Sequence, residues 1–484
     1  MRFPKIDTDH RELKEVFDWS VVKAHEYVAT DRIFPIDHTD RVAKSIPCYW
    51  AGYRTRHAFY IRDFVHQADG AWLLGLDEEN YRMMEAFVRS ATKERGYFAL
   101  WALCFDGSPY YGDYKSDDSF VREIPSQFEL VECIYKLYLK TGDKRYLSDE
   151  MFDFCTRMVT TFVETLDTDK NGVPEGLGHH ESISCTYDER GDEEDAYFEA
   201  GDGIGCQYQA YLAYAGLCKA RGDCRSYEIW MDKAEELKRY FNDEWSVVNG
   251  DKDSTFAHAI LMKDKSKKLQ GFAKETSVFM PLKLVTEAGK RTSAYLDLIN
   301  AGQGTGIGFP GANSNIEGYT YYPDLYFLYN RVDDAWKWMR YIMDHRHDPH
   351  ESPRQGPNCY YPELSYTFVS HVVQGLMGVS VNVPDNSITT LSKLPNDIRY
   401  LNLKEQKMGN NTVTIMHFGR QYSSLSNLEG EDITWNIQFE GIHDHIAVDI
   451  DGFDGECEVK YINGAPVTCI TVTVKANHTV TAHV

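Results

Sequence analysis

Hydrophobic residues recur every three to four positions from about Val16 to Val381, which predicts a long helical region. Several of the predicted helices are joined by short turns in which a glycine can end one helix and an aspartate can cap the next. Such turns follow Leu74, Thr141 and Arg221, and they are typical of antiparallel helix pairs. The predicted helices span 15–28, 54–75, 77–93, 119–141, 144–166, 195–221, 224–243, 272–289, 291–300, 317–330, 332–345 and 363–380.

Long acidic and aromatic loops alternate with these tight turns. They cover residues 100–118, 167–194, 301–316 and 346–362. Short turns at one end of the helix pairs and long loops at the other indicate a closed ring of helices with its site at the long-loop end.

The hydrophobic pattern changes after Val381. Residues 382–386 read as a linker, and the segments beyond them alternate between polar and apolar residues, as strands with one buried face do. We therefore expect a helical domain over residues 1–381 and a small antiparallel β domain, similar to a β-sandwich, over residues 387–484. The predicted strands are 412–417, 433–439, 445–450, 456–462 and 468–474.

Composition narrows the function. The formal net charge of -23 argues against nucleic acid or an anionic membrane as a partner, because phosphate groups would be repelled. The 11 cysteines are scattered without a CxxC pair, so we expect neither a zinc site nor a disulfide framework, and no cofactor. The first residues lack an apolar signal region, which favours a cytoplasmic enzyme; a homo-oligomer stays open.

The first candidate site residues surround an arginine–aspartate pair. Arg62 and Asp63 lie where a predicted helix begins, and they could hold sugar hydroxyls through charge-assisted hydrogen bonds or form an ion pair that anchors the helix start. Two aromatic residues and a histidine near the pair in the sequence could also line a sugar site. They are Trp50, Tyr60 and His66.

This segment resembles the first substrate-binding loop of the six-hairpin glycosidases, a superfamily that includes glucoamylase-like enzymes, neutral invertases and bile-acid β-glucosidase-like enzymes. The resemblance implies a mainly α fold, an (α/α)6 barrel, followed here by the small antiparallel β domain. It also implies that Arg62 and Asp63 bind the non-reducing-end sugar of an oligosaccharide or glycoside.

The second predicted site lies in the loop 167–194, between the fifth and sixth predicted helices, where these glycosidases carry their general acid. Its candidates are Glu175, Glu181 and Asp188, and we favour Asp188 because it follows Tyr187 in a Thr-Tyr-Asp sequence similar to the acid-bearing motif of the bile-acid β-glucosidase-like enzymes. The charged run 189–195 departs from that family. His180 is a candidate sugar ligand, whereas adjacent histidines are poorly placed to hold one metal ion.

The third predicted site is the Tyr-Pro-Glu sequence that opens the last predicted helix. Glu363 resembles the second carboxylate of the same glycosidases, although a glutamate in the first turn also suits the helix dipole. Tyr361 beside it could contact substrate. Arg122 and Glu123, at the start of another predicted helix, are further candidate ligands or a buried ion pair.

These patterns predict a glycoside hydrolase with a general acid and a second carboxylate that acts as base or nucleophile. The glucoamylase-like part of the resemblance implies inversion, which we prefer, and the Thr-Tyr-Asp part implies retention. Other sugar-active enzymes share this fold, so a phosphorylase, an epimerase, a uronide hydrolase and a lyase remain alternatives, as does a carbohydrate-binding protein without activity.

Overall fold

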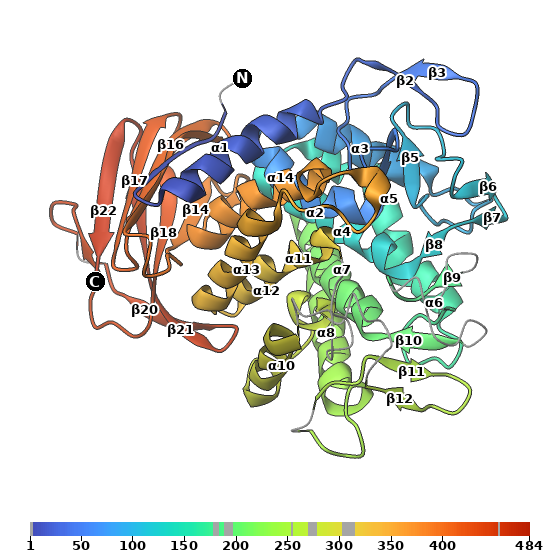
Figure 1. The fold of residues 1–484 in the computed structure, drawn as a ribbon. Coiled ribbons are helices and arrows are strands. Elements are labelled where there is room, and N and C mark those ends of the chain that lie inside the picture. The colour runs from blue at the N-terminus through green and yellow to red at the C-terminus, as the bar shows by residue number, and fades with distance from the viewer. Residues whose placement is uncertain are drawn as a thin grey trace.

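A computed structural model describes residues 3–177, 183–187, 197–252, 255–269, 278–302, 315–453 and 455–484 of the chain. A helical region and a β region lie side by side, with the two ends of the chain on the β side (Figure 1). None of the helices in these ranges is both long and apolar enough to cross a membrane.

The helices follow the predicted order along the chain. They are α1 (Arg11–Glu26), α2 (Ile61–Leu73), α3 (Asp77–Ser90), α4 (Ile124–Thr141), α5 (Asp149–Arg157), α6 (Val163–Leu166), α7 (Gly201–Ala220), α8 (Cys224–Tyr240), α9 (Phe279–Leu282), α10 (Lys290–Gly302), α11 (Ile316–Tyr319), α12 (Tyr321–Leu328), α13 (Val332–His345) and α14 (Pro362–Ser370). Wider π-helical turns follow α5, α8 and α14, at Met158–Phe162, Phe241–Trp245 and His371–Leu376.

Every second helix belongs to an inner layer. α2 packs on α4, α4 on α7, α7 on α9 and α9 on α12; α12 packs on the π-helical turn that continues α14, and α14 packs back on α2. These contacts lead from α2 through the later helices and back to α2, and the predicted barrel stays a prediction.

Several predicted helices differ from the structure in their bounds: for example, the segment 195–221 becomes helical only at Gly201, and in the described part of 272–289 only Phe279–Leu282 is α-helical. The segment 54–75 becomes helical only at Ile61, because β4 (Ala58–Tyr60) pairs with β5 (Ala102–Cys104). Likewise α4 starts at Ile124 after two short strands, and the segment 144–166 is interrupted by a 3-10 turn and a π-helical turn. Periodicity does not register such interruptions, because the apolar residues on both sides face the same core.

The glycine turns adopt the predicted conformation. Gly142 has a φ of 68°, in the left-handed region, and its N–H donates to the Tyr138 carbonyl. Asp143 and Asp223 cap the next segments through their side chains. The prediction for the first turn was wrong: Asp77 is already the first residue of α3 and makes no capping hydrogen bond, because the chain enters the helix one residue earlier, at Leu76.

The β region consists of two sheets. Their strand orders are β1-β15-β16-β17-β22-β19 and β13-β14-β18-β21-β20. The strands are β1 (Lys5–Thr8), β13 (Ser380–Asn382), β14 (Ser387–Leu391), β15 (Tyr400–Met408), β16 (Asn411–Phe418), β17 (Tyr422–Glu429), β18 (Ile433–Glu440), β19 (Ala447–Val448), β20 (Glu458–Ile462), β21 (Ala465–Val474) and β22 (His478–His483). Thus the N-terminal β1 joins the C-terminal sheet by pairing with β15.

Several short strands lie in the loops of the helical region, on its long-loop side. They are β2 (Ile33–Pro35), β3 (Val42–Lys44), β6 (Tyr114–Ser116), β7 (Ser119–Phe120), β8 (Arg122–Glu123), β9 (Ile183–Ser184), β10 (Phe198–Ala200), β11 (Ala259–Leu261) and β12 (Lys267–Lys268). The parallel pairing of β8 with β9 ties the second long loop to the start of α4.

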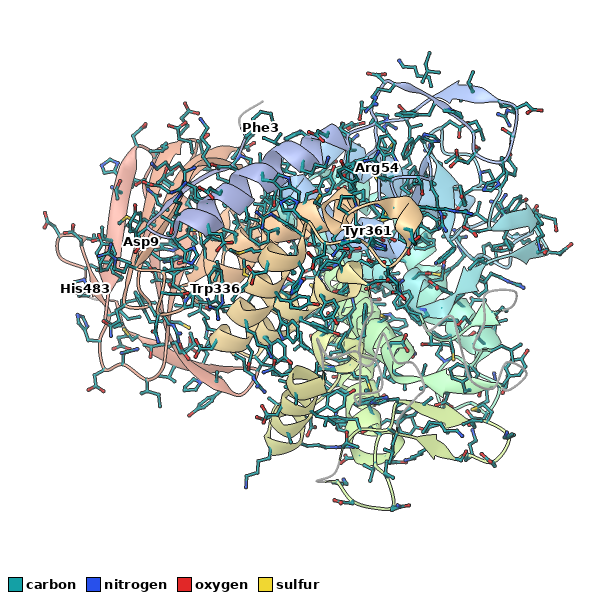
Figure 2. The ribbon with its side chains drawn as sticks, viewed as in Figure 1. Phe3, Asp9, Arg54, Trp336, Tyr361 and His483 are labelled. Atoms are coloured by element: carbon teal, nitrogen blue, oxygen red, sulfur yellow. The ribbon has the colours of Figure 1, made fainter. Side chains whose placement is uncertain are left out.

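The two regions share one continuous apolar core and also make polar contacts. Trp336 of α13 donates its indole N–H to Asp397 over 2.9 Å, and Arg399 donates to Asp9 over 2.8 Å. Figure 2 labels Trp336 and Asp9, which lie along this boundary. His417 of β16 is completely buried and bonds the Met377 carbonyl, at the end of the helical region, over 3.0 Å.

Candidate functional site

The first turn of α2 carries Arg62 and Asp63. Tyr60, the last residue of β4, directly precedes the helix in an extended conformation, so the strand pairing determines where the helix begins. Asp63 accepts a hydrogen bond from the Tyr361 hydroxyl, although the two residues lie almost three hundred positions apart in the chain. The start of α2 therefore faces the start of α14.

The first turn of α14 carries Glu363. Tyr361 precedes the helix and Pro362 is its first residue, which suits a position whose N–H would lack a helical partner. Glu363 is only 2% exposed, and its Oε1 contacts the Thr320 hydroxyl at 3.3 Å. Figure 2 shows Tyr361 at this helix start, next to Arg54 from a distant segment.

Close packing of α2 against α14 holds these two first turns together. Gly70 of α2 lies so near the Tyr366 carbonyl that a Cβ atom added there would stand 2.0 Å from the oxygen. Gln67, in the orientation that satisfies both ends of its amide, accepts from the Glu363 N–H over 2.7 Å and donates to the Trp50 carbonyl over 3.1 Å. A side chain larger than hydrogen at position 70 would thus separate the two helices.

His66 links Glu363 to a third inner helix. Its Nδ1 bonds Glu363 Oε1, its Nε2 lies 2.9 Å from Asp324 Oδ2 of α12, and its ring stacks on Tyr321 with centroids 3.8 Å apart. Burial lowers the pKa of His66, but the hydrogen bonds to Asp324 and Glu363 outweigh this effect and raise the pKa to about 9.

The two first-turn carboxyls have shifted pKa values. Burial raises the pKa of Glu363 to about 7; the hydrogen bond from His66 opposes the shift, and the charges of Asp63 and Glu317 add to it. Burial also raises the pKa of Asp63, against the hydrogen bond from Tyr361 and the charge of Arg62. A buried carboxyl with a raised pKa can exchange a proton near neutral pH, as acid–base catalysis requires.

Tyr187 of the second long loop reaches this cluster. The Arg62 guanidinium lies over its ring, 4.9 Å from the centroid, and the Tyr187 hydroxyl donates to Glu129 of α4. Glu129 in turn pairs with Lys283 at 2.7 Å. The structure therefore brings together five of the predicted residues, namely Arg62, Asp63, His66, Tyr361 and Glu363, with Tyr187 at their edge.

Glu175 is buried and holds its own loop together. Its carboxylate accepts hydrogen bonds from the backbone N–H groups of Thr168 and Asp169 at 3.0 and 3.3 Å, and from the Thr168 hydroxyl. These bonds stabilise the turn that leads out of α6, and a catalytic role for Glu175 stays a prediction.

Glu123 and Arg122 occupy the short strand before α4. Glu123 is 2% exposed and accepts from the Trp101 indole N–H over 2.8 Å. The Arg122 guanidinium lies over the Phe120 ring at 5.2 Å, and burial lowers its pKa. Each thus contacts an aromatic side chain, and their role as substrate ligands stays a prediction.

Trp50 and Tyr60 belong to aromatic clusters. Trp50 packs between Phe34 and Phe105, with centroids 5.1 and 4.5 Å away. The Tyr60 hydroxyl accepts from Arg56 over 2.7 Å and donates to Asp113 over 3.2 Å. Both rings are at least nine-tenths buried, so in this conformation they pack in the interior beside the β4–α2 junction. The remaining candidates, His180, Glu181 and Asp188, lie outside the described residues.

Sequence reasoning did not single out three polar residues that complete the cluster. Asp324 accepts from His66, His371 approaches the same aspartate, and Glu317 bonds His350 at 3.0 Å. A signal was present in the sequence: Tyr321 and Asp324 are three residues apart, which places both on one face of a helix.

Two groups of side chains in the described ranges have donor atoms close enough to hold a metal ion. One is His66, Asp324 and His371, and the other is Asp167, Asp169 and Glu175; in each group the donor atoms lie within 4.8 Å of one another. In the second group, Asp167 and Glu175 already accept hydrogen bonds from backbone N–H groups and so stabilise the turn in which they lie.

Comparison of the sequence with protein-family models and with curated proteins finds no match. Solved structures with a similar fold do exist. A GH78 family rhamnosidase of Bacillus sp. GL1 superposes with a TM-score of 0.61 at 11% identity, over 89% of this chain and 41% of the rhamnosidase. An α-L-rhamnosidase of Dictyoglumus thermophilum gives a TM-score of 0.59 at 12% identity, over 100% of this chain and 50% of the other.

A protein from the human microbiome, assigned as a kojibiose phosphorylase, gives a TM-score of 0.51 at 9% identity over 98% of this chain and 67% of the other. The chain spans half or less of the length of the two rhamnosidases. The chain therefore shares its fold with these solved structures. At these identities the likeness concerns the fold alone.

Proposed function

We propose that this chain is a glycoside hydrolase that cleaves the non-reducing-end sugar from an oligosaccharide or glycoside. In this proposal, residues 1–381 form an (α/α)6 barrel with the site at its long-loop end, and residues 387–484 form the appended β domain. The observation that carries the proposal is the pair of carboxyls in the facing first turns of α2 and α14, the partly buried Asp63 and the buried Glu363.

Burying carboxyl groups is costly unless they are paired or serve a function. Asp63 keeps an ordered hydrogen bond from Tyr361, and Arg62 lies beside it in the same turn. This arrangement suits a pair that grips sugar hydroxyls while its own geometry is held by the protein. Glu363 then serves as the second carboxylate, oriented by His66 and Thr320.

The general acid in this proposal is Asp188, with Glu181 and Glu175 as alternatives. The support for Asp188 is the position of Tyr187, the residue before it. The Tyr187 ring lies under the Arg62 guanidinium, at the edge of the cluster. An acid on one side of the glycosidic bond and a base on the other would cleave it with inversion, which we favour; inverting enzymes hold the two carboxyls roughly 6.5–9.5 Å apart to leave room for water.

A screen of turnover tests the proposal. The purified chain is incubated with nitrophenyl glycosides, including α-L-rhamnoside, α-mannoside and α-glucoside, and with natural disaccharides, each with and without phosphate. Phosphate-independent sugar release is the expected result, and NMR of the first-formed anomer then distinguishes inversion from retention. No release from any substrate under either condition would contradict hydrolysis of common glycosides.

A phosphorylase is the second candidate, because the fold also matches the protein assigned as a kojibiose phosphorylase. In that case sugar release would require phosphate and would yield a sugar phosphate. The same screen separates the two functions by the phosphate dependence of turnover.

A further inference from the structure

A partly buried cluster of two histidines and an aspartate lies beside Glu363. It consists of His66 from α2, Asp324 from α12 and His371 from the π-helical turn after α14. His66 Nε2 lies 2.9 Å and His371 Nε2 lies 3.3 Å from the same oxygen, Asp324 Oδ2. Three separate helical segments thus bring one ligand atom each to within 4.8 Å of one another.

His371 is the residue that calls for an explanation. Its side chain is fully buried, yet neither ring nitrogen makes an aligned hydrogen bond to any group in the described ranges. A buried polar group without a partner costs about 1–3 kcal/mol. A wider helical turn of the π type carries this histidine, and such turns occur frequently at functional sites.

The spacing of the three donors suits a metal ion. Two ligands at about 2.1 Å from a tetrahedral ion lie roughly 3.4 Å apart, close to the separation of His371 Nε2 from Asp324 Oδ2. His66 also shows the outer contact expected of a metal-binding histidine, because its other nitrogen, Nδ1, bonds the carboxylate of Glu363. Two imidazoles and one carboxylate form a donor set that zinc accepts readily.

The cluster also has space beside it for a further ligand. His66 and Asp324 line a pocket of about 370 Å³, and the Asp324 side chain is 34% exposed. Catalytic and exchangeable metal sites keep such an open position for water, while three protein groups hold the ion.

We propose that His66, Asp324 and His371 bind one divalent transition-metal ion, with zinc as the preferred ion. On binding, the ion takes the place of the proton on His66 Nε2, and that proton is released to water. His66 is then neutral, with its remaining N–H on Nδ1 donating to Glu363. The metal would hold α2, α12 and α14 together directly behind the carboxyl that we assign to catalysis, although the proposal does not depend on that assignment.

Metal binding by the full chain tests the proposal. Protein treated with EDTA and dialysed is titrated with Zn²⁺ by calorimetry, and separately with Co²⁺, whose visible absorption reports coordination by nitrogen and oxygen ligands. We expect one ion per chain. His371→Gln and Asp324→Asn should each weaken zinc binding at least 10-fold, since even the loss of an outer contact typically costs 10–100-fold.

His345→Gln is the matched control. His345, at the exposed end of α13, bonds Asp348 at 2.6 Å. It therefore makes a histidine–aspartate contact outside the cluster. The variant should bind zinc like the unaltered chain. Circular dichroism of each variant separates loss of the site from loss of the fold. Absence of stoichiometric zinc binding in the unaltered chain, or undiminished binding in folded His371→Gln, would overturn the proposal and leave a hydrogen-bonded chain from Asp324 through His66 to Glu363.

Discussion

The core of the β region and the long-loop end of the inner helices enclose different kinds of residue. Between the two sheets lie fully buried apolar side chains such as Ile437, Phe439 and Val474. Between α2, α12 and α14 lie His66, Asp63 and Glu363. Apolar burial stabilises a fold directly, whereas buried charges cost free energy that hydrogen bonds only partly return. We infer from this difference that the charged groups between the inner helices are retained for function and not for stability.

Two buried polar side chains of the β region support this distinction, because partners on neighbouring strands satisfy them. Trp435 donates its indole N–H to Thr390 over 2.9 Å within one sheet, and His417 bonds Ser423 on the neighbouring strand over 2.8 Å. In the helical region, by contrast, the charge of Glu317 raises the pKa of both Asp63 and Glu363, and the charge of Asp63 also raises the pKa of Glu363. Substitutions in the two regions should therefore separate stability from activity.

The largest effect on stability is expected for Phe439→Ala in the core of the β region. Removing a fully buried ring should lower the free energy of unfolding by about 3–5 kcal/mol through lost transfer energy and the cavity left behind. Denaturant unfolding measures this loss, and turnover at a temperature where the variant remains folded should be unchanged. The control is Phe418→Ala on an exposed position of β16, which should alter stability by no more than about 0.5 kcal/mol.

Glu363→Gln should lower turnover and leave stability intact, the opposite of Phe439→Ala. We expect turnover to fall at least ~100-fold, the usual scale for losing an acid or base, while the free energy of unfolding is maintained or rises. The amide retains the shape of the side chain but cannot carry the charge. Glu12→Gln, at an exposed glutamate in the first turn of α1, is the control. Normal turnover of the Glu363 variant would remove this residue from the mechanism.

Asp188→Asn should also cost at least ~100-fold in turnover, with the loss depending on the leaving group. A general acid protonates the departing oxygen, so substrates with a natural sugar leaving group should suffer more than activated nitrophenyl glycosides. Rates for the two substrate types, compared in Asp188→Asn, Glu181→Gln and Glu175→Gln, identify the acid. A larger leaving-group effect in either glutamate variant would transfer the role to that residue.

The smallest effect concerns His417, which lies where the β region meets the helical region. Burial lowers the pKa of His417 to about 4, and its bond to the Met377 carbonyl opposes this shift only in part. Between about pH 4 and 6.5 the unfolded chain binds a proton at this position that the folded chain does not. Stability contributed by the neutral ring is therefore present above pH 6.5 and is lost as the pH falls, by about 2 kcal/mol between pH 7 and pH 5.

Denaturant unfolding at pH 5 and pH 7 measures this dependence. In His417→Gln the contribution should vanish, because an amide does not titrate, and the difference between the two pH values should shrink accordingly. An equal pH dependence in the variant and the unaltered chain would show that other groups cause it.

Parts of the fold were readable from the sequence because their determinants are local. The glycine turns and the amphipathic pattern predicted α3, α8, α10 and α13 close to their observed bounds, since a 3.6-residue period needs no knowledge of distant segments. The strands β15, β17 and β22 were missed. β15 contains adjacent charged residues at a bulge between Leu403 and Gln406, and β17 is rich in serine, so neither shows the clear alternation of a strand.

The sequence by itself determined the paired helices, the change to strands after Val381 and the position of carboxyls at two helix starts. It did not determine which buried groups meet. His66 contacts Asp324 across 258 positions and Glu363 across 297, and both contacts exist only because α2 packs between helices from the other end of the domain. Helical periodicity reflects which face of a helix is buried, whereas the partner on the opposite side depends on how the whole ring of helices closes.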